Sequence, residues 1–252
     1  MIELIDLTKK YKELVAVDRI NLCVDNGVAF GFLGPNGAGK TTTIRMMAGV
    51  LRPSSGRILL NGIDISKEPQ RAKSIVGYIP DNPFLYEKLT AREFLNFISG
   101  LYNSDHLIDI ETRIEDLLQK FGLTHWSDEL IESYSHGMKQ RLIMCSALLH
   151  DPDIIIVDEP MVGLDPHAAR MVKNLFRTLA AEGKTLFIST HSLEVAEAVC
   201  DQIAIIQAGR IIAHGTPERL KRMAGVDGGL EEIFLSLTQD GPVAHEKPLS
   251  SY

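Results

Sequence analysis

The residues best suited to bind phosphate form one short stretch, Gly34-Pro35-Asn36-Gly37-Ala38-Gly39-Lys40-Thr41-Thr42. The stretch fits the phosphate-loop pattern G-x-x-x-x-G-K-[ST], in which glycines let backbone N–H groups wrap closely around phosphates. The apolar run Val28 to Leu33 precedes it, and a helical-looking segment, Thr42 to Val50, follows. The N-terminus of such a helix adds donors and partial positive charge. We therefore predict that Lys40 reaches the β- and γ-phosphates of a nucleotide and that the Thr41 hydroxyl binds Mg²⁺.

A second group of reactive side chains follows two apolar runs. Asp158 and Glu159 come directly after Ile154 to Val157, and His191 comes shortly after Thr185 to Ser189. Sites in α/β proteins lie at the carboxyl ends of parallel strands. We expect Asp158 to help hold Mg²⁺, whereas Glu159 is either the acceptor of a proton from the attacking water or a solvated carboxylate. In the same way, His191 is either a γ-phosphate contact or a structural histidine.

An α/β core is needed to position these residues, and the apolar patterns predict one. The runs at 154–157 and 185–189 read as buried parallel strands, whereas Ile2 to Leu7 alternates like a half-buried strand. Tyr11, between that strand and the next, is either a platform for a purine base or a packing tyrosine. The remaining predicted elements are strands at 15–24, 57–60 and 75–79, a hairpin of 203–207 with 210–213, and helices at 192–199, 216–223 and 230–238.

Residues from about 85 to 150 predict a helical insertion between strands of this core. Thr90 and Glu93 have the spacing of a capping box, which marks a helix start. Apolar residues then recur at helical spacing, and we expect these stripes to be core packing. They comprise Phe94, Phe97, Ile98 and Leu101, followed by Ile110, Ile114, Leu117, Leu118 and Phe121.

Composition excludes several functional classes. The chain has 252 residues, a net charge of -7 and 45% hydrophobic residues, which suits a folded domain and argues against nucleic acid as a partner. Its three cysteines, Cys23, Cys145 and Cys200, lack metal-binding spacing, so we expect reduced, buried thiols in a cytosolic protein. The N-terminus does not resemble a signal peptide, no apolar segment is long enough to span a bilayer, and 239–252 reads as a mobile tail.

Taken together, the motifs resemble the ATP-binding subunits of ABC transporters over roughly Ile2 to Thr238. The resemblance implies one ATPase domain, 1–238, of α/β class: a P-loop NTPase core with a mainly parallel central sheet, an N-terminal antiparallel β-subdomain and an inserted α-helical subdomain. The core would comprise 1–84 and 150–215, the helical subdomain 85–149 and the C-terminal helices 216–238. The matching segments are the phosphate loop, Tyr134-Ser135-His136-Gly137-Met138-Lys139-Gln140-Arg141, Ile154 to Glu159, Gly163-Leu164-Asp165-Pro166 and Ser189-Thr190-His191.

The resemblance also implies roles for single residues. Tyr11 would stack on adenine, with Val17 beside it, while Lys40, Glu159 and His191 would act on the γ-phosphate and the attacking water. Two nucleotides would be sandwiched head to tail in a dimer. Each would be held by the phosphate loop of one subunit and by the signature residues of the other; those signature residues are Ser135 and Gly137, and Asp165 crosses the interface.

This sequence departs from the family pattern in two places. The common signature is Leu-Ser-Gly-Gly-Gln, of which only Ser135 and Gly137 are kept; this variant looks like that of bacterial exporters whose membrane subunits are separate chains. Asp81 stands where the family usually has a glutamine that touches Mg²⁺ and the lytic water. A carboxylate can also bind metal, but it adds negative charge near the phosphates.

From these features we expect an ATPase subunit that dimerises on binding ATP and Mg²⁺ and powers export through a separate transmembrane permease subunit. It would lie on the cytoplasmic face of the membrane, and its second ATP-binding subunit would be another copy of this chain or a related one. Alternatives are a P-loop phosphotransferase, which needs no role for Ser135, and a soluble ABC-type ATPase without a transport role, which would carry coiled-coil insertions or tandem cores.

Overall fold

The protein is described by a computed structural model, which covers residues 1–82, 84–102, 110–161, 164–225 and 229–238. Two sheets form its centre, a four-stranded sheet of order β2-β1-β4-β5 and a six-stranded sheet of order β10-β9-β3-β8-β7-β6. The strands are β1 Ile2–Tyr11, β2 Leu14–Val24, β3 Ala29–Leu33, β4 Ser55–Leu60, β5 Ile63–Asp64, β6 Val76–Ile79, β7 Ile154–Asp158, β8 Thr185–Thr190, β9 Gln202–Gln207 and β10 Arg210–Gly215. The helices are α1 Lys40–Met47, α2 Pro69–Ser74, α3 Ala91–Leu101, α4 Ile110–Lys120, α5 His136–Leu148, α6 Pro166–Ala181, α7 Leu193–Val199, α8 Pro217–Ala224 and α9 Leu230–Thr238, with short 3-10 helices at Thr124–Trp126 and Ile131–Ser133.

The six-stranded sheet is mainly parallel, as predicted. Strands β3, β7 and β8 are buried at every position because apolar residues fill both faces. Strand β3 pairs in parallel with both β8 and β9, β7 pairs in parallel with β8 and β6, and only β10 is antiparallel to its neighbour. The carboxyl ends of β3, β7 and β8 therefore lie side by side, which is where the sequence places the phosphate loop, the paired acids and His191.

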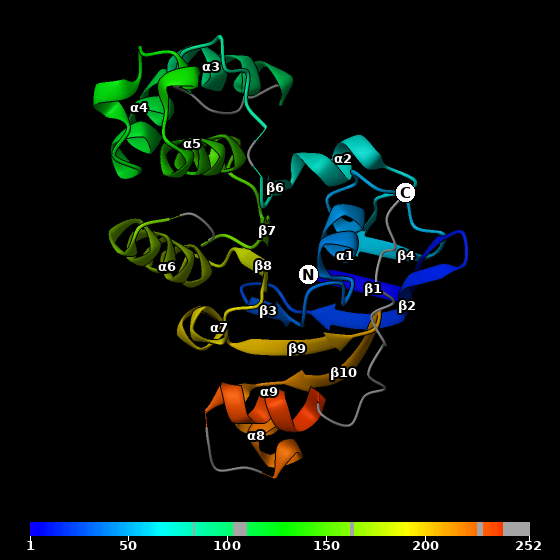
Figure 1. Cartoon of the computed structure of the whole chain (residues 1–252). Coiled ribbons are helices and arrows are strands. Elements are labelled where there is room, and N and C mark those ends of the chain that lie inside the picture. The colour runs from blue at the N-terminus through cyan, green and yellow to red at the C-terminus, as the bar shows by residue number, and fades with distance from the viewer. Residues whose placement is uncertain (83, 103–109, 162–163, 226–228, 239–252) are drawn as a thin grey trace, which may run out of the picture.

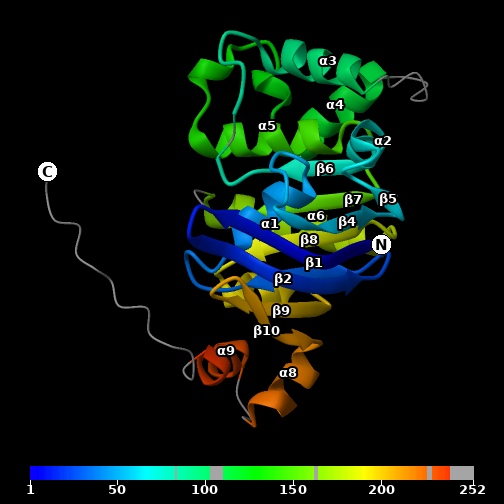
Figure 2. The same ribbon diagram turned by 90° about the vertical axis from the view of Figure 1, so that its right-hand side faces the viewer.

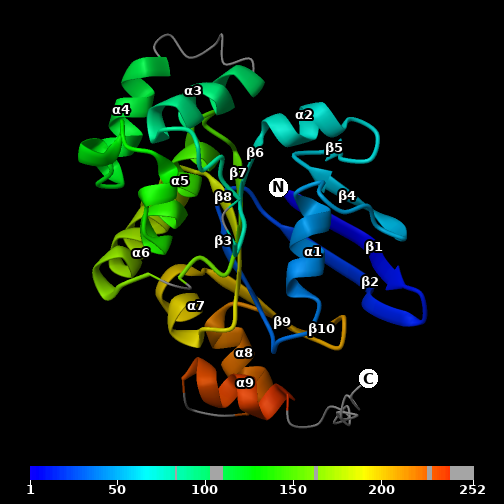
Figure 3. The same ribbon diagram turned by 45° about the horizontal axis from the view of Figure 1, so that its top comes forward.

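Helix α1 lies between the two sheets, and α6 and α7 cover the opposite face of the larger sheet (Figures 1 and 3). Ile44 and Met46 of α1 share one buried cluster with Leu4 of the smaller sheet and with Phe30 and Ile156 of the larger one. A second cluster joins the other face of the larger sheet to α6, α7 and the inserted helices. This arrangement makes α1, and hence the phosphate loop at its start, part of a rigid three-layer core.

The predicted helical insertion is confirmed: α3, α4 and α5 follow β6 and precede β7, and they form a separate layer at the top of Figure 2. The capping box is also confirmed, because Thr90 Oγ1 accepts from the Glu93 N–H at 3.2 Å while the Glu93 carboxylate accepts from the Thr90 N–H at 2.9 Å. The expectation that the whole apolar stripe is core is wrong. Phe97 and Leu101 are 46% and 64% exposed, because α3 packs on one side only.

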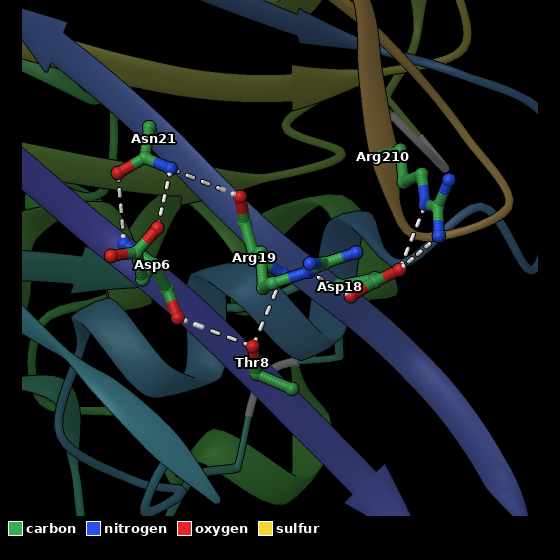
Figure 4. A network of polar contacts seen from close by, with 6 residues as sticks. All are labelled: Asp6, Thr8, Asp18, Arg19, Asn21 and Arg210. Carbon is green, nitrogen blue, oxygen red and sulfur yellow. Dashed lines mark hydrogen bonds and ion pairs between the residues drawn. The ribbon is translucent and has the colours of Figure 1, made fainter.

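Two residues have left-handed backbone where the pairing of β1 and β2 in the smaller sheet shifts register, Asp6 (φ 47°) on β1 and Arg19 (φ 49°) on β2. Figure 4 shows the polar contacts that hold this irregularity. Asp6 exchanges hydrogen bonds with Asn21 at 2.9 and 2.8 Å, and the Arg19 N–H donates to the Thr8 hydroxyl at 3.1 Å. The polar groups at this irregularity therefore stay hydrogen-bonded although the strand pairing is interrupted there.

Several local expectations differ from the structure. The phosphate-loop helix spans Lys40–Met47 rather than 42–50, and β1 extends to Tyr11 rather than ending at Leu7. Cys145 and Cys200 are buried as expected, but Cys23 is exposed, because Leu22 and Val24 on either side of it turn inward and strand side chains alternate. The predicted tail, 239–252, lies outside the described residues.

Candidate nucleotide-binding site

The phosphate loop connects β3 to α1 and is pressed against neighbouring backbone. A Cβ on Gly34 would lie 2.3 Å from the carbonyl oxygen of Ile206, and a Cβ on Gly39 would lie 2.6 Å from that of Ala16. Gly39 also has φ of 109°, which a side chain strongly disfavours. The loop therefore needs glycine at these two positions, and it leaves the first N–H groups of α1 available to an anion.

Lys40, the first residue of α1, is buried against the loop. Its ammonium donates to the Gly34 carbonyl at 2.8 Å and to the Pro35 carbonyl at 3.3 Å. It also lies 3.7 Å from Glu159 Oε1. A cation is thus held over the phosphate loop and beside the predicted catalytic acid, as a γ-phosphate site requires.

The two acids at the end of β7 have different environments. Asp158 is fully buried, and its Oδ1 accepts a hydrogen bond from the Ser189 hydroxyl. Burial raises the pKa of Asp158 above its usual range, the nearby Asp81 and Glu159 carboxylates add to this, and the hydroxyls of Ser189 and Thr41 oppose it. No hydrogen bond of ordinary length and angle reaches its buried Oδ2 among the described residues, although the Thr41 hydroxyl is close enough to stabilise the carboxylate.

That buried oxygen fits a bound cation. A carboxylate oxygen buried without a partner is costly unless something positive binds it, and Mg²⁺ is typically held by one or two carboxylates together with substrate phosphates and water. Within the described parts of the chain, no cluster of three or more His, Cys, Asp or Glu residues has metal-binding geometry. Asp158 and the Thr41 hydroxyl would therefore hold Mg²⁺ together with the nucleotide rather than in a site made of protein groups alone.

Glu159 lies at the centre of the predicted catalytic group. Its backbone adopts φ of 49°, unusual for a residue with a side chain, and its N–H donates to the Ser189 carbonyl at 3.1 Å. Glu159 Oε2 lies 3.0 Å from His191 Nδ1 and accepts from the His191 N–H at 3.4 Å. The half-buried carboxylate thus lies between the ammonium of Lys40 and the exposed imidazole of His191, in a position to accept a proton from water.

A depression of about 390 Å³ unites most of the predicted residues. Two residues that the sequence did not single out, Leu14 and Ala16, line it beside Tyr11, which is 46% exposed and has the Lys9 ammonium 5.1 Å from its ring centre. Val17, a predicted nucleotide contact, does not line the depression, and its side chain is 0% exposed in the core. The predicted residues in the lining are Tyr11, Pro35, Asn36, Gly37, Gly39, Lys40, Thr41, Thr42, Asp81 and Glu159.

Strand alternation explains why Val17 is buried while its neighbour lines the depression. Side chains of successive strand residues point to opposite faces, so the inward position of Val17 directs Ala16 to the other face. Tyr11, Leu14 and Ala16 therefore lie together in the lining of the depression.

Comparison with known proteins agrees with this geometry. The ABC transporter domain family matches residues 17–162. The ABC transporter ATP-binding protein NatA of Bacillus subtilis (strain 168) is 36% identical over 241 residues, which cover 94% of this chain and 97% of NatA. A solved structure described as the ATP binding subunit of an ABC transporter has a TM-score of 0.88 and 33% identity over 94% of this chain and 99% of its own. The chain belongs to the ABC transporter family.

Another ABC transporter relative is longer. The probable multidrug ABC transporter ATP-binding protein YbhF of Escherichia coli (strain K12) is 36% identical over 249 residues, which cover 97% of this chain and 43% of YbhF. The chain thus spans less than half of YbhF. None of the helices in the described ranges is long and apolar enough to cross a membrane.

In this ABC cassette, the signature residues lie away from the phosphate loop of the same chain. Ser135 caps α5, where its hydroxyl accepts from the Met138 N–H at 3.3 Å, and neither Ser135 nor Gly137 lines the depression. Asp165 caps α6 and accepts from the N–H groups of His167 and Ala168, both at 2.9 Å. These hydrogen bonds lower the pKa of Asp165, and the one from the Ala168 N–H has the larger effect. The exposed carboxylate is therefore charged at neutral pH.

Asp81, the departure from the ABC family pattern, lines the same depression as the phosphate loop. Its Oδ2 accepts from the Asn82 side-chain amide at 3.0 Å. Because it also raises the pKa of Asp158, the added negative charge expected from the sequence is present at the predicted metal site.

Proposed function

We propose that this chain is the ATP-hydrolysing subunit of an ABC exporter and that it works through a separate transmembrane subunit. One observation carries the proposal: a single depression joins the phosphate loop, Lys40, Thr41 and Glu159, with Asp158 buried beneath them, in a chain of the ABC transporter family. ATP and Mg²⁺ are the ligands that this set of groups suits.

The chemistry follows from the charges in the site. The Lys40 ammonium stabilises negative charge that develops on the γ-phosphate, and loop N–H groups bind the other phosphate oxygens. Glu159 accepts a proton from the attacking water, and His191, 3.0 Å away, keeps the carboxylate oriented. Bound Mg²⁺ would supply further neutralisation of phosphate charge at Thr41 and Asp158, with Asp81 as an additional candidate ligand.

The site is incomplete within one chain. Ser135 and Gly137 begin α5 at an exposed helix N-terminus, a favourable place for phosphate, yet they do not line the depression of their own chain. We infer that they complete the site of a second ATP-binding subunit, in a dimer that closes around two nucleotides and reopens after hydrolysis, with Asp165 at the interface.

The membrane partner would bind the apolar surface beside Asp81. Phe84, Tyr86, Phe97 and Leu101 are all exposed, and Tyr86 meets Phe97 edge to face with ring centres 5.4 Å apart. Exposed aromatic surface of this kind is typical of protein interaction sites. A permease subunit binding here would hold the chain at the cytoplasmic face of the membrane and transmit closure of the dimer to the transport pathway.

A complementation experiment tests this function. Lys40→Ala and Ser135→Arg variants, each alone, should hydrolyse ATP at less than about 1% of the parent rate, because each removes a group required in the transition state. Mixing the two restores one intact site per heterodimer, since one subunit keeps its phosphate loop and the other its signature. We expect ATPase activity to reappear in the mixture and to rise more steeply than linearly with protein concentration.

The control is a mixture of Glu159→Gln with Lys40→Ala. Both changes affect the half-site on the phosphate-loop side, so no heterodimer in that mixture has an intact site. A mixture of Lys40→Ala with Ser135→Arg that stays as inactive as this control contradicts the dimeric site. A Glu159→Gln variant that hydrolyses ATP as fast as the parent contradicts the assignment of the base.

A further inference from the structure

Ser189 contacts both acids of the site, although the sequence assigned a role only to His191 in the segment Ser189-Thr190-His191. Strands β7 and β8 are parallel neighbours in which Asp158 lies opposite Ser189, and both residues are fully buried. The Ser189 hydroxyl donates to Asp158 Oδ1. Because this bond holds one carboxylate oxygen, it restricts rotation of the carboxylate and keeps the buried Oδ2 pointing in one direction.

The backbone of Ser189 acts on the other acid. Its carbonyl accepts the Glu159 N–H at 3.1 Å, which continues the pairing of β7 with β8 one residue beyond Asp158. Glu159 needs such support, since a left-handed backbone is unfavourable for a residue with a Cβ. From this backbone position the carboxylate reaches both Lys40 and His191.

Other hydroxyls of β8 have different roles. Thr185 Oγ1 accepts from the Gly27 N–H at the start of the strand, and Thr190 Oγ1 accepts from the Ser192 N–H at its end. Both therefore support backbone turns. A hydroxyl buried in an otherwise apolar strand is destabilising unless it is hydrogen-bonded, and at Ser189 the bond is made to a site carboxylate.

We propose that Ser189 is a positioning residue for binding of the magnesium–nucleotide complex: its hydroxyl holds Asp158 Oδ1 and so fixes the direction in which Oδ2 would be presented to Mg²⁺, and its carbonyl holds the backbone from which Glu159 reaches Lys40 and His191. The inference rests on the proposed function, because it requires Asp158 to be a metal ligand. Residues that orient a metal ligand in this way typically change metal affinity about 10- to 100-fold when they are removed.

Equilibrium binding tests the role without relying on turnover. In a Glu159→Gln background, the dissociation constant of ATP is measured by calorimetry in excess Mg²⁺ and again in EDTA. The ratio, defined as the dissociation constant in EDTA divided by that in Mg²⁺, reports how strongly Mg²⁺ supports binding. Ser189→Ala should lower this ratio about tenfold or more while leaving binding in EDTA unchanged. Ser189→Thr keeps the hydroxyl and should restore the parent ratio.

Ser146→Ala is the matched control. Ser146 is also a buried serine with one hydrogen bond, to the Ile143 carbonyl at 2.8 Å within α5, so its loss should leave the ratio unchanged. If Ser189→Ala does not fold, Ser189→Cys keeps the volume with a weaker donor and should lower the ratio in the same direction.

An unchanged ratio in Ser189→Ala or Ser189→Cys overturns the inference. If affinity falls equally in Mg²⁺ and in EDTA, so that the ratio stays the same, the role of Ser189 is purely structural. Asp158→Asn separates this inference from the proposed function. If Asp158→Asn lowers the ratio strongly while Ser189→Ala keeps the ratio of the parent, only the role of Ser189 is contradicted. An unchanged ratio in Asp158→Asn removes Asp158 as the metal ligand and the inference with it.

Discussion

Replacing Gly39 with alanine tests how closely the phosphate loop is pressed against β2. The added Cβ would lie 2.6 Å from the Ala16 carbonyl oxygen, and Gly39 has φ of 109°. Gly37→Ala is the matched control, because Gly37 also has positive φ, 78°, but a Cβ there would meet nothing within 4 Å. The pair therefore separates backbone strain alone from strain combined with a backbone clash.

The magnitudes follow from these two geometries. For Gly37→Ala, left-handed strain of about 1–2 kcal/mol is partly offset by the lower entropy of the unfolded chain, about 0.4–1 kcal/mol, so the free energy of unfolding falls by about 1 kcal/mol. Gly39→Ala adds the displacement of a packed backbone atom, roughly 1–3 kcal/mol, for a total of about 3 kcal/mol. For a chain of this size, these losses lower the melting temperature by about 3 °C and about 10 °C.

Thermal unfolding without nucleotide measures the two variants, and calorimetry then measures ATP affinity. Because displacement of the loop moves its N–H donors, we expect Gly39→Ala to weaken ATP binding about tenfold or more, which is about 1.4 kcal/mol. Equal losses of stability in Gly37→Ala and Gly39→Ala would refute the reasoning, since they would mean that the contact with Ala16 has no energetic effect.

Three further outcomes are expected. Thr90→Ala removes the capping box of α3 and should lower the free energy of unfolding by about 1 kcal/mol, measured by urea denaturation, with ATP affinity unchanged. Burial lowers the pKa of His150 to about 4, below its unfolded value. The contribution of neutral His150 to the free energy of unfolding is therefore constant above about pH 6.5 and is lost between pH 6.5 and 4. The loss should be roughly 2–3 kcal/mol, and His150→Phe, which keeps an aromatic ring against Tyr102, should flatten the dependence of stability on pH in that window. Lys40→Met should weaken ATP binding more than tenfold by calorimetry, because it removes a buried ammonium and leaves Glu159 without its cation; a smaller effect would place the phosphates elsewhere.

Features determined by short stretches of sequence were predicted well. The cap of α6 by Asp165, the box at Thr90 and the hairpin around Ala208-Gly209 depend on residues a few positions apart, so local patterns suffice. Burial was predicted less well. Cys23, Phe97 and Val17 each lie in the expected element, but whether each faces core, solvent or nucleotide depends on which sheet or helix covers that element.

The sequence by itself determined the elements that carry the site and predicted its chemistry. A glycine-rich loop between an apolar run and a helix, together with acids after a continuous apolar run, predicts phosphate and metal chemistry from local patterns alone. Only the tertiary structure decided which strands are neighbours. Because β3 lies between β8 and β9, and β7 pairs with β8, residues more than a hundred positions apart share one edge of the sheet, and Ser189 meets Asp158 there. The same packing places Ser135 on a separate helical layer, outside the pocket of its own chain. Such long-range contacts follow from the burial of whole faces, which no short stretch of sequence encodes.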